Sequence, residues 1–102
     1  MFTKASLLGV VEEILEGYLY KIRGKDDEVM RVELANVYCP IANEPGAYEC
    51  REFARKSLLG KEINIFPKKD SKFNTEATVV RTSDNKDIET LLIEHGYGFI
   101  KE

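Results

Sequence analysis

The residues best suited to chemistry stand at Tyr38, Cys39 and Pro40, where a stretch with strand character runs into a loop. Strand ends of this kind are where many folds place functional side chains. A tyrosine beside a thiol could form a reactive pair, but a cysteine nucleophile needs a base to deprotonate it. The only histidine, His95, comes far later in the chain and has no evident reason to lie near Cys39. The sequence therefore gives little support to a thiol mechanism.

The two cysteines, Cys39 and Cys50, are too few for a disulfide scaffold and lack a CxxC spacing. Together with a single histidine they do not supply the ligands of a structural zinc site. We therefore expect two buried, reduced thiols and neither a metal nor another cofactor.

Composition narrows the class of protein. The chain has 102 residues, of which 43% are hydrophobic and 32% charged, as in one soluble domain with a single core. No apolar run of about 18 residues is present, and Glu12 and Glu13 interrupt any signal-peptide core. We therefore expect a cytoplasmic or nuclear protein with no membrane partner. The formal charge of −3 means that any nucleic-acid affinity must come from a local basic patch.

The first part of the chain has the residue pattern of three strands. Residues 7–15 and 18–24 are rich in branched and aromatic side chains, and the turn signal Glu16-Gly17 separates them. Residues 29–38 alternate, which predicts a third strand with Met30, Val32 and Leu34 pointing inward.

The second part of the chain contains two helical patterns. Pro45 and Gly60 bracket the first helix, and its apolar face is predicted to comprise Cys50, Phe53, Ala54, Ser57 and Leu58. A strand over 61–67, a polar loop over 68–76 and a short strand over 77–83 follow. The last helix lies within 85–99, and its buried side is predicted to comprise Ile88, Leu91 and Leu92, with His95 as a further candidate.

The predicted order is strand, strand, strand, helix, strand, strand, helix. This is the α+β layout of a five-stranded OB-fold β-barrel with a helix between strands 3 and 4 and a C-terminal helix. Other small α+β folds could use the same order of elements. OB barrels commonly bind oligonucleotides across one face, although a fold alone does not fix a function.

Four segments resemble the staphylococcal-nuclease-like (thermonuclease) family. EPGAYECREFARKSLLGKEI is similar to the family's helix, which starts with Tyr-Gly-Pro-Glu-Ala and leaves through Leu-Leu-Gly-Lys. LEGYLYKIRG, ELANVYCPI and DIETLLIEHGYGFI resemble its Asp-Gly-Asp-Thr hairpin, its Asp-x-Pro-Glu segment and its last helix. The resemblance covers nearly the whole chain and is nearest to the first repeats of the Tudor staphylococcal nuclease (Tudor-SN) family. It implies that residues 1–102, from Met1 to Glu102, are one repeat of a longer protein, the N-terminal one.

Active members of that family cut nucleic acid with Ca²⁺ held by carboxylates, a general-base glutamate and two arginines. The resemblance places the two metal-binding aspartates at Tyr18 and Tyr38 and the two arginines at Glu33 and near Thr75. It places the general base at Ile41. None of these five positions keeps the catalytic residue. The resemblance therefore implies a domain without catalytic residues, and residual Ca²⁺-dependent nuclease activity is the least favoured reading.

The remaining chemistry is recognition. Tyr18, Tyr20 and Tyr38 are aromatic candidates near the barrel mouth, because bases stack on such rings. Candidates for a phosphate path are Lys21, Arg23, Arg31, Lys68, Lys69 and Lys72, with Phe73 beside them. The alternative is that the tyrosines fill the barrel mouth while the lysines keep the loops soluble.

Two functions remain open from the sequence. In the first, the domain adds weak RNA binding to a Tudor-SN-type protein, in RNA-silencing or transcriptional co-activator assemblies, in the cytoplasm with some nuclear presence. Those assemblies and their protein partners are implied by the resemblance alone. In the second, the domain is a protein-interaction or spacer module without nucleic-acid contact, which the net negative charge and the acidic stretches 12–13 and 26–28 favour.

Overall fold

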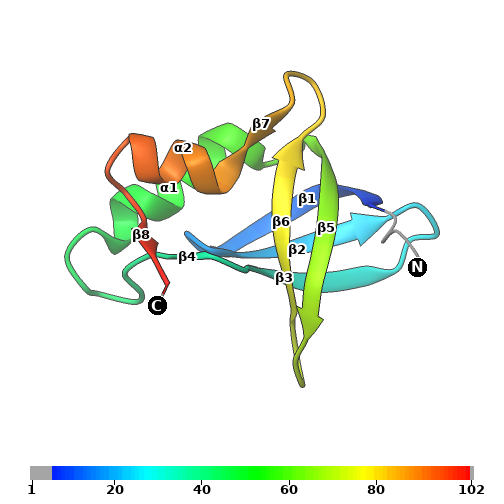
Figure 1. The fold of residues 1–102 in the computed structure, drawn as a ribbon, viewed down its shortest axis with the longest axis horizontal. Coiled ribbons are helices and arrows are strands. Elements are labelled where there is room, and N and C mark those ends of the chain that lie inside the picture. The colour runs from blue at the N-terminus through cyan, green and yellow to red at the C-terminus, as the bar shows by residue number, and fades with distance from the viewer. Residues whose placement is uncertain (1–5, 102) are drawn as a thin grey trace.

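Five strands of the computed structural model, which describes residues 6–101, close into a barrel (Figure 1). These barrel strands are β1 (Leu7–Glu16), β2 (Leu19–Gly24), β3 (Val29–Leu34), β5 (Glu62–Asp70) and β6 (Thr75–Arg81). The short strands are β4 (Val37–Tyr38), β7 (Lys86–Asp87) and β8 (Phe99–Ile100), and the helices are α1 (Ala47–Leu58) and α2 (Ile88–Glu94). The expectations about the chain ends fall on residues 1–5 and 102, outside the described range.

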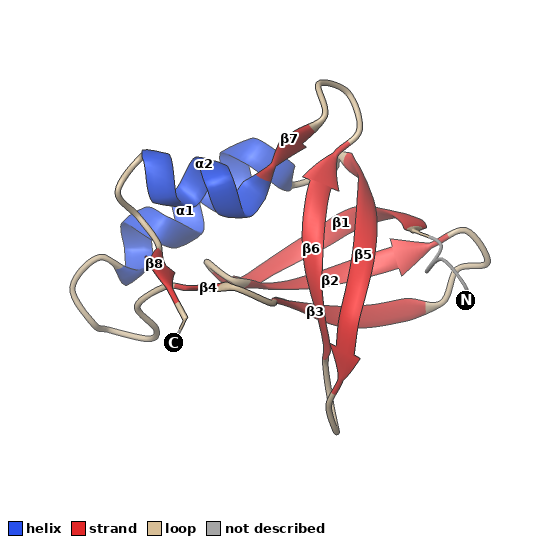
Figure 2. Ribbon diagram, viewed as in Figure 1, coloured by secondary structure: helices blue, strands red, loops and turns tan. Residues whose placement is uncertain are grey.

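The barrel closes because β3 pairs with both of its neighbours. It is antiparallel to β2 and parallel to β6, while β1 lies antiparallel between β2 and β5, and β5 is antiparallel to β6. The predicted OB-fold barrel in an α+β domain is therefore confirmed. In the chain, α1 lies between β4 and β5, and both helices are at one end of the barrel (Figure 2).

Alternation along the strands fills the barrel interior, since successive side chains point to opposite faces. Tyr20 and Ile22 of β2 and Val32 and Leu34 of β3 are fully buried. Met30 packs against the edge of the same core. The predicted inward face of the third strand is therefore confirmed over the length of β3.

The helices bury the stripes that their periodicity predicts. In α1 the buried residues are Ala47, Cys50, Ala54, Ser57 and Leu58, with Phe53 packed partly against the core. In α2, Ile88 and Leu92 are fully buried and Leu91 packs beside them. His95, the further candidate for this side, is exposed, because it lies beyond the last residue of the helix. Neither helix within residues 6–101 has the length and apolar content that crossing a membrane requires.

The predicted third strand, 29–38, is interrupted after Leu34. The Glu89 carboxylate of α2 accepts hydrogen bonds from Asn36 N, at 2.6 Å, and from Asn36 Nδ2, at 3.2 Å. Beyond this contact the alternation changes phase, so Val37 is buried and Tyr38 is exposed. The two residues of β4 pair with β8 rather than with the barrel.

The predicted loop over 68–76 is also shorter than expected. The β5–β6 ladder continues through Lys69 and Asp70 to its last pair, Asp70 with Thr75. Only residues 71–74 connect the two strands. The polar composition of this segment reflects exposed strand ends as well as the loop.

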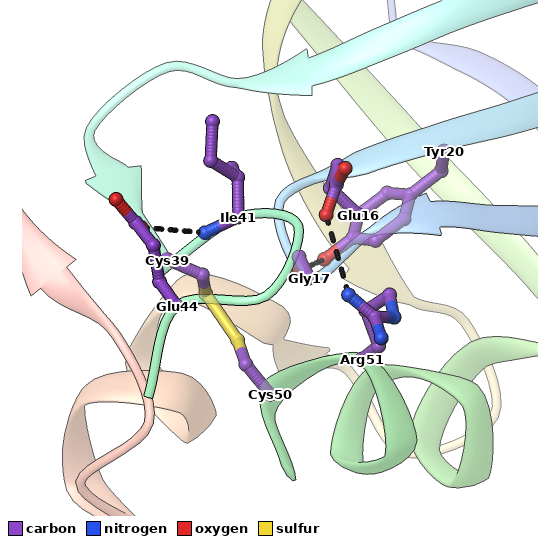
Figure 3. The surroundings of a disulfide bond; sticks show 8 residues. All are labelled: Glu16, Gly17, Tyr20, Cys39, Ile41, Glu44, Cys50 and Arg51. Carbon is purple, nitrogen blue, oxygen red and sulfur yellow. Dashed lines mark hydrogen bonds and ion pairs between the residues drawn. A yellow bond between two sulfur atoms is a disulfide. The ribbon is translucent and has the colours of Figure 1, made fainter. Parts of the chain in front are cut away.

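The expectation of reduced thiols is wrong, because Cys39 and Cys50 form a disulfide with a Cα–Cα distance of 6.6 Å (Figure 3). Both cysteines are fully buried. Gly17 lies against the bond, and a Cβ added there would overlap Cys50 Sγ and lie 3.1 Å from Cys39 Sγ. The spacing of 11 residues hid this pairing, because only the returning loop brings the start of α1 back to the end of β4.

We predict that the Glu89→Ala variant loses about 1.5–3 kcal/mol of unfolding free energy, as expected for hydrogen bonds to a charged group. Urea unfolding followed by circular dichroism measures this loss. Glu94→Ala, at an exposed position of the same helix, should change the stability by less than about 0.5 kcal/mol. Equal stabilities of the two variants would contradict the structural role of Glu89.

We also predict that a Cys39→Ala, Cys50→Ala double variant is less stable than the oxidised protein by about 3 kcal/mol, the chain-entropy value for a loop of similar length. The measurement is urea unfolding with and without reductant, and reductant should affect only the parent protein. Mass spectrometry after denaturation and alkylation without reductant should find both cysteines unmodified. Two alkylated cysteines would show that the bond is absent.

Candidate functional site at the barrel mouth

Three aromatic rings form a row at the barrel mouth; we call Tyr18, Tyr38 and Phe99 the mouth rings. The ring centroids of Tyr18 and Tyr38 are 6.1 Å apart, and those of Tyr38 and Phe99 are 6.3 Å apart. Tyr38 is 42% exposed and Phe99 is 54% exposed. The row exists because Tyr38 of β4 and Phe99 of β8 are direct partners in the two-stranded ribbon.

The turn between β1 and β2 holds Tyr18 in this row. Leu34 N donates to Tyr18 O at 2.9 Å, and Tyr20 Oη donates to Gly17 O at 2.7 Å. Tyr20 is fully buried, and this burial raises the pKa of its hydroxyl. Of the three tyrosines proposed from the sequence as stacking residues, Tyr20 is therefore excluded, because alternation places it inside the barrel.

Glu33 lies beside the mouth rings and is held by two donors. Asn74 Nδ2 and Lys101 Nζ each lie 3.1 Å from its carboxylate oxygens. The pKa of Tyr18 is raised above its ordinary value, first by burial and then by the negative charges of Glu33 and Glu16. Where the nuclease resemblance implies an arginine, the mouth therefore carries the carboxylate of Glu33, which is paired with Lys101.

The nuclease resemblance places catalytic residues at five positions of this chain, and the structure shows what each of them contacts. Tyr18, Glu33 and Tyr38 are neighbours, as described above. Ile41 is exposed and its N–H donates to Glu44 Oε1 at 2.9 Å, while Thr75 Oγ1 donates to an Asp70 oxygen at 3.1 Å.

Other carboxylates near the mouth do not assemble into a metal site. Glu16 Oε1 lies 3.6 Å from Arg51 Nη1 of α1 (Figure 3). Within residues 6–101, no three His, Cys, Asp or Glu side chains are arranged to hold a metal ion.

Arg31 connects the mouth to a neighbouring surface hollow. Its Nε donates to Asn74 Oδ1 at 3.1 Å, so Asn74 contacts both Arg31 and Glu33. Together with Lys72 and Phe73, Arg31 lines a surface hollow of about 300 Å³. Lys72 Nζ lies 5.4 Å from the centroid of the Phe73 ring, which is 75% exposed.

The other basic candidates lie in three separate places. Lys21 lies directly opposite Arg31 on the outer face of β2 and β3. Lys68 and Lys69 are exposed towards the far end of β5. Arg23 is engaged by Glu12 and Asp27 and does not join the mouth.

Two residues of the mouth escaped the sequence analysis. Phe99 falls at the end of the segment predicted to hold the last helix, Lys101 follows that segment, and neither residue matches a binding motif. They reach the mouth only because Gly98 permits a close return: a Cβ there would lie 2.7 Å from Val37 Cγ1. Their contacts with Tyr38 and Glu33 span long sequence separations, which residue patterns do not report.

Searches with the whole sequence match no protein-family model and give no significant match among curated proteins. The likeness to the staphylococcal-nuclease-like family therefore rests on the quoted motifs. The geometry and chemistry of the mouth are what indicate a function for this domain.

We predict that Glu33→Gln lowers the pKa of Tyr18 towards its ordinary value of 10.0, because one of the negative charges that raise it is removed. The pKa should stay above 10.0, since burial is the largest cause of the shift. A pH titration of the tyrosine ring signals by NMR measures this change. Glu94→Gln, which changes a charge on α2, is the control, and an equal response in both variants would contradict the proximity of Glu33.

Proposed function

We propose that this domain is a non-catalytic OB-fold module that contributes to the binding of single-stranded RNA in a protein of the Tudor-SN type. The observation that carries the proposal is the row of mouth rings, of which Tyr38 and Phe99 are partly exposed. Base stacking on an aromatic side chain is worth roughly 1–3 kcal/mol and tolerates any sequence. Two accessible rings in contact offer two neighbouring stacking positions.

The charges near the mouth support contact with a phosphate backbone. Lys21 and Arg31 are adjacent on the outer face, and the hollow lined by Arg31 and Lys72 continues from them through Asn74. The net charge of −3 and the acidic Glu33 limit the affinity of one domain. Linked repeats would raise the overall affinity through effective concentration.

The absence of catalysis in the proposal rests on residue chemistry. A hard cation such as Ca²⁺ takes carboxylate and carbonyl oxygens, whereas Tyr18 and Tyr38 stand where the resemblance places the metal-binding aspartates. The proposal extends, through the resemblance, to RNA-silencing or transcriptional co-activator assemblies and to a cytoplasmic location with some nuclear presence.

A protein-interaction module without nucleic-acid contact is the second candidate. Ile41, Phe99 and Ile100 are exposed apolar side chains in the loop after β4 and in β8. Apolar and aromatic residues of this kind are enriched in the cores of protein interfaces. RNA binding at the mouth distinguishes the two candidates.

We predict that Tyr38→Ala and Phe99→Ala each weaken single-stranded RNA binding by about 5- to 150-fold, the equivalent of one lost stacking contact. The measurement is fluorescence anisotropy of an end-labelled oligoribonucleotide at low and at physiological salt. Tyr48→Ala, which removes an exposed ring from α1, is the matched control and should bind like the parent protein.

Several outcomes would overturn the proposal. A flat titration at both salt concentrations would favour the protein-interaction module. Equal losses in all three variants would separate binding from the mouth rings. An anisotropy that falls with time only when Ca²⁺ is added would reveal nuclease activity.

A further inference from the structure

The two-stranded ribbon of β4 and β8 has a second face. Alternation sends Tyr38 and Phe99 to the mouth, and their neighbours Val37 and Ile100 form a cross-strand pair on the opposite face. Val37 is buried, whereas Ile100 is 63% exposed. In Figure 1, α2 lies above β4 and β8 in the view.

A hollow of about 310 Å³ lies between α2 and this second face; we call it the α2 hollow. Its wall is mainly apolar and includes Val37, Ile93 and Ile100. Its acidic residues are Asp87, Glu89 and Glu94. Among the described residues that line it there is no lysine, arginine or histidine.

The three carboxylates of the α2 hollow differ in their hydrogen-bond and ion-pair partners. Glu89 is buried and engaged by Asn36, and Asp87 Oδ1 accepts a hydrogen bond from Glu89 N at 2.8 Å. Glu94 is exposed and has no hydrogen-bond or ion-pair partner within residues 6–101. Lys101, next to Ile100, does not neutralise this charge, because its Nζ binds Glu33 at the mouth. The α2 hollow therefore combines an apolar wall with an uncompensated acidic rim.

We propose that the α2 hollow binds an arginine side chain presented by a segment of a partner protein. An arginine has an apolar stem that packs along hydrophobic surface and a cationic head that stays at the rim. Its planar guanidinium donates two parallel hydrogen bonds to a carboxylate such as that of Glu94. A phosphate group would be repelled by the same carboxylates, so this surface favours a basic peptide over RNA. The proposal does not depend on RNA binding at the mouth.

The test is an NMR titration of the ¹⁵N-labelled protein with the blocked peptide acetyl-Ala-Arg-Ile-Arg-Ala-amide. We expect saturable shifts at the amides of Thr90, Ile93 and Ile100. The same peptide with citrulline in place of arginine keeps the shape and removes the charge, and it should bind at least about tenfold more weakly, a difference of 1.4 kcal/mol.

Two charge-reversal variants locate the contact. Glu94→Lys, at an exposed site, should weaken the arginine peptide at least about tenfold, whereas Glu49→Lys on α1 should leave its binding unchanged. Circular dichroism of each variant checks that it is folded. The Tyr38→Ala variant should bind the peptide like the parent protein, which separates this site from the mouth.

The proposal is overturned if the arginine peptide causes no saturable shift at these amides, if the citrulline peptide binds equally well, or if Glu94→Lys has no effect. It is also overturned if single-stranded RNA shifts the same three amides. Sedimentation that shows a dimer of the parent protein, lost in Glu94→Lys, would assign the α2 hollow to a second copy of the chain instead.

Discussion

The contact between Glu89 and Asn36 is the interaction on which both candidate sites depend. A carboxylate of α2 accepts two hydrogen bonds from a residue just beyond β3. This contact lies where the chain leaves the barrel, so the next two residues can form β4 and pair with β8. If β3 continued straight, Tyr38 would take the inward phase of Val32 and Leu34, and the row of mouth rings would not form.

The disulfide secures the other side of β4. It joins the residue after Tyr38 to the first turns of α1, and its two sulfur atoms lie over Gly17, next to Tyr18. The turn that carries Tyr18 and the strand that carries Tyr38 are therefore held to the same helix. A disulfide of this kind persists in oxidising surroundings, which differs from the reducing compartment that the sequence suggested. The localisation implied by the family resemblance remains a proposal.

The ribbon of β4 and β8 separates two electrostatic environments. On the mouth face, Glu33 is neutralised by Lys101, and Arg31 is linked to it through Asn74. On the opposite face, Glu94 has no cationic partner among the described residues. Two residues per strand suffice for this division, because alternation places adjacent side chains on opposite faces. The two faces of the ribbon therefore differ in whether their carboxylates are paired with cations.

The sequence by itself determined the features that repeat locally: the inward face of β3, the buried stripe of α1 and the barrel order of the elements. The sequence also showed that none of the five positions implied by the nuclease resemblance keeps a catalytic residue, because residue identity is read without a fold. These positions are Tyr18, Glu33, Tyr38, Ile41 and Thr75. Only the tertiary structure decided the Cys39–Cys50 bond, the burial of Tyr20 and the place of Phe99 in the mouth. These features depend on contacts between segments distant in the chain. Periodicity reports the environment along one element and carries no information about which segment will pack against it.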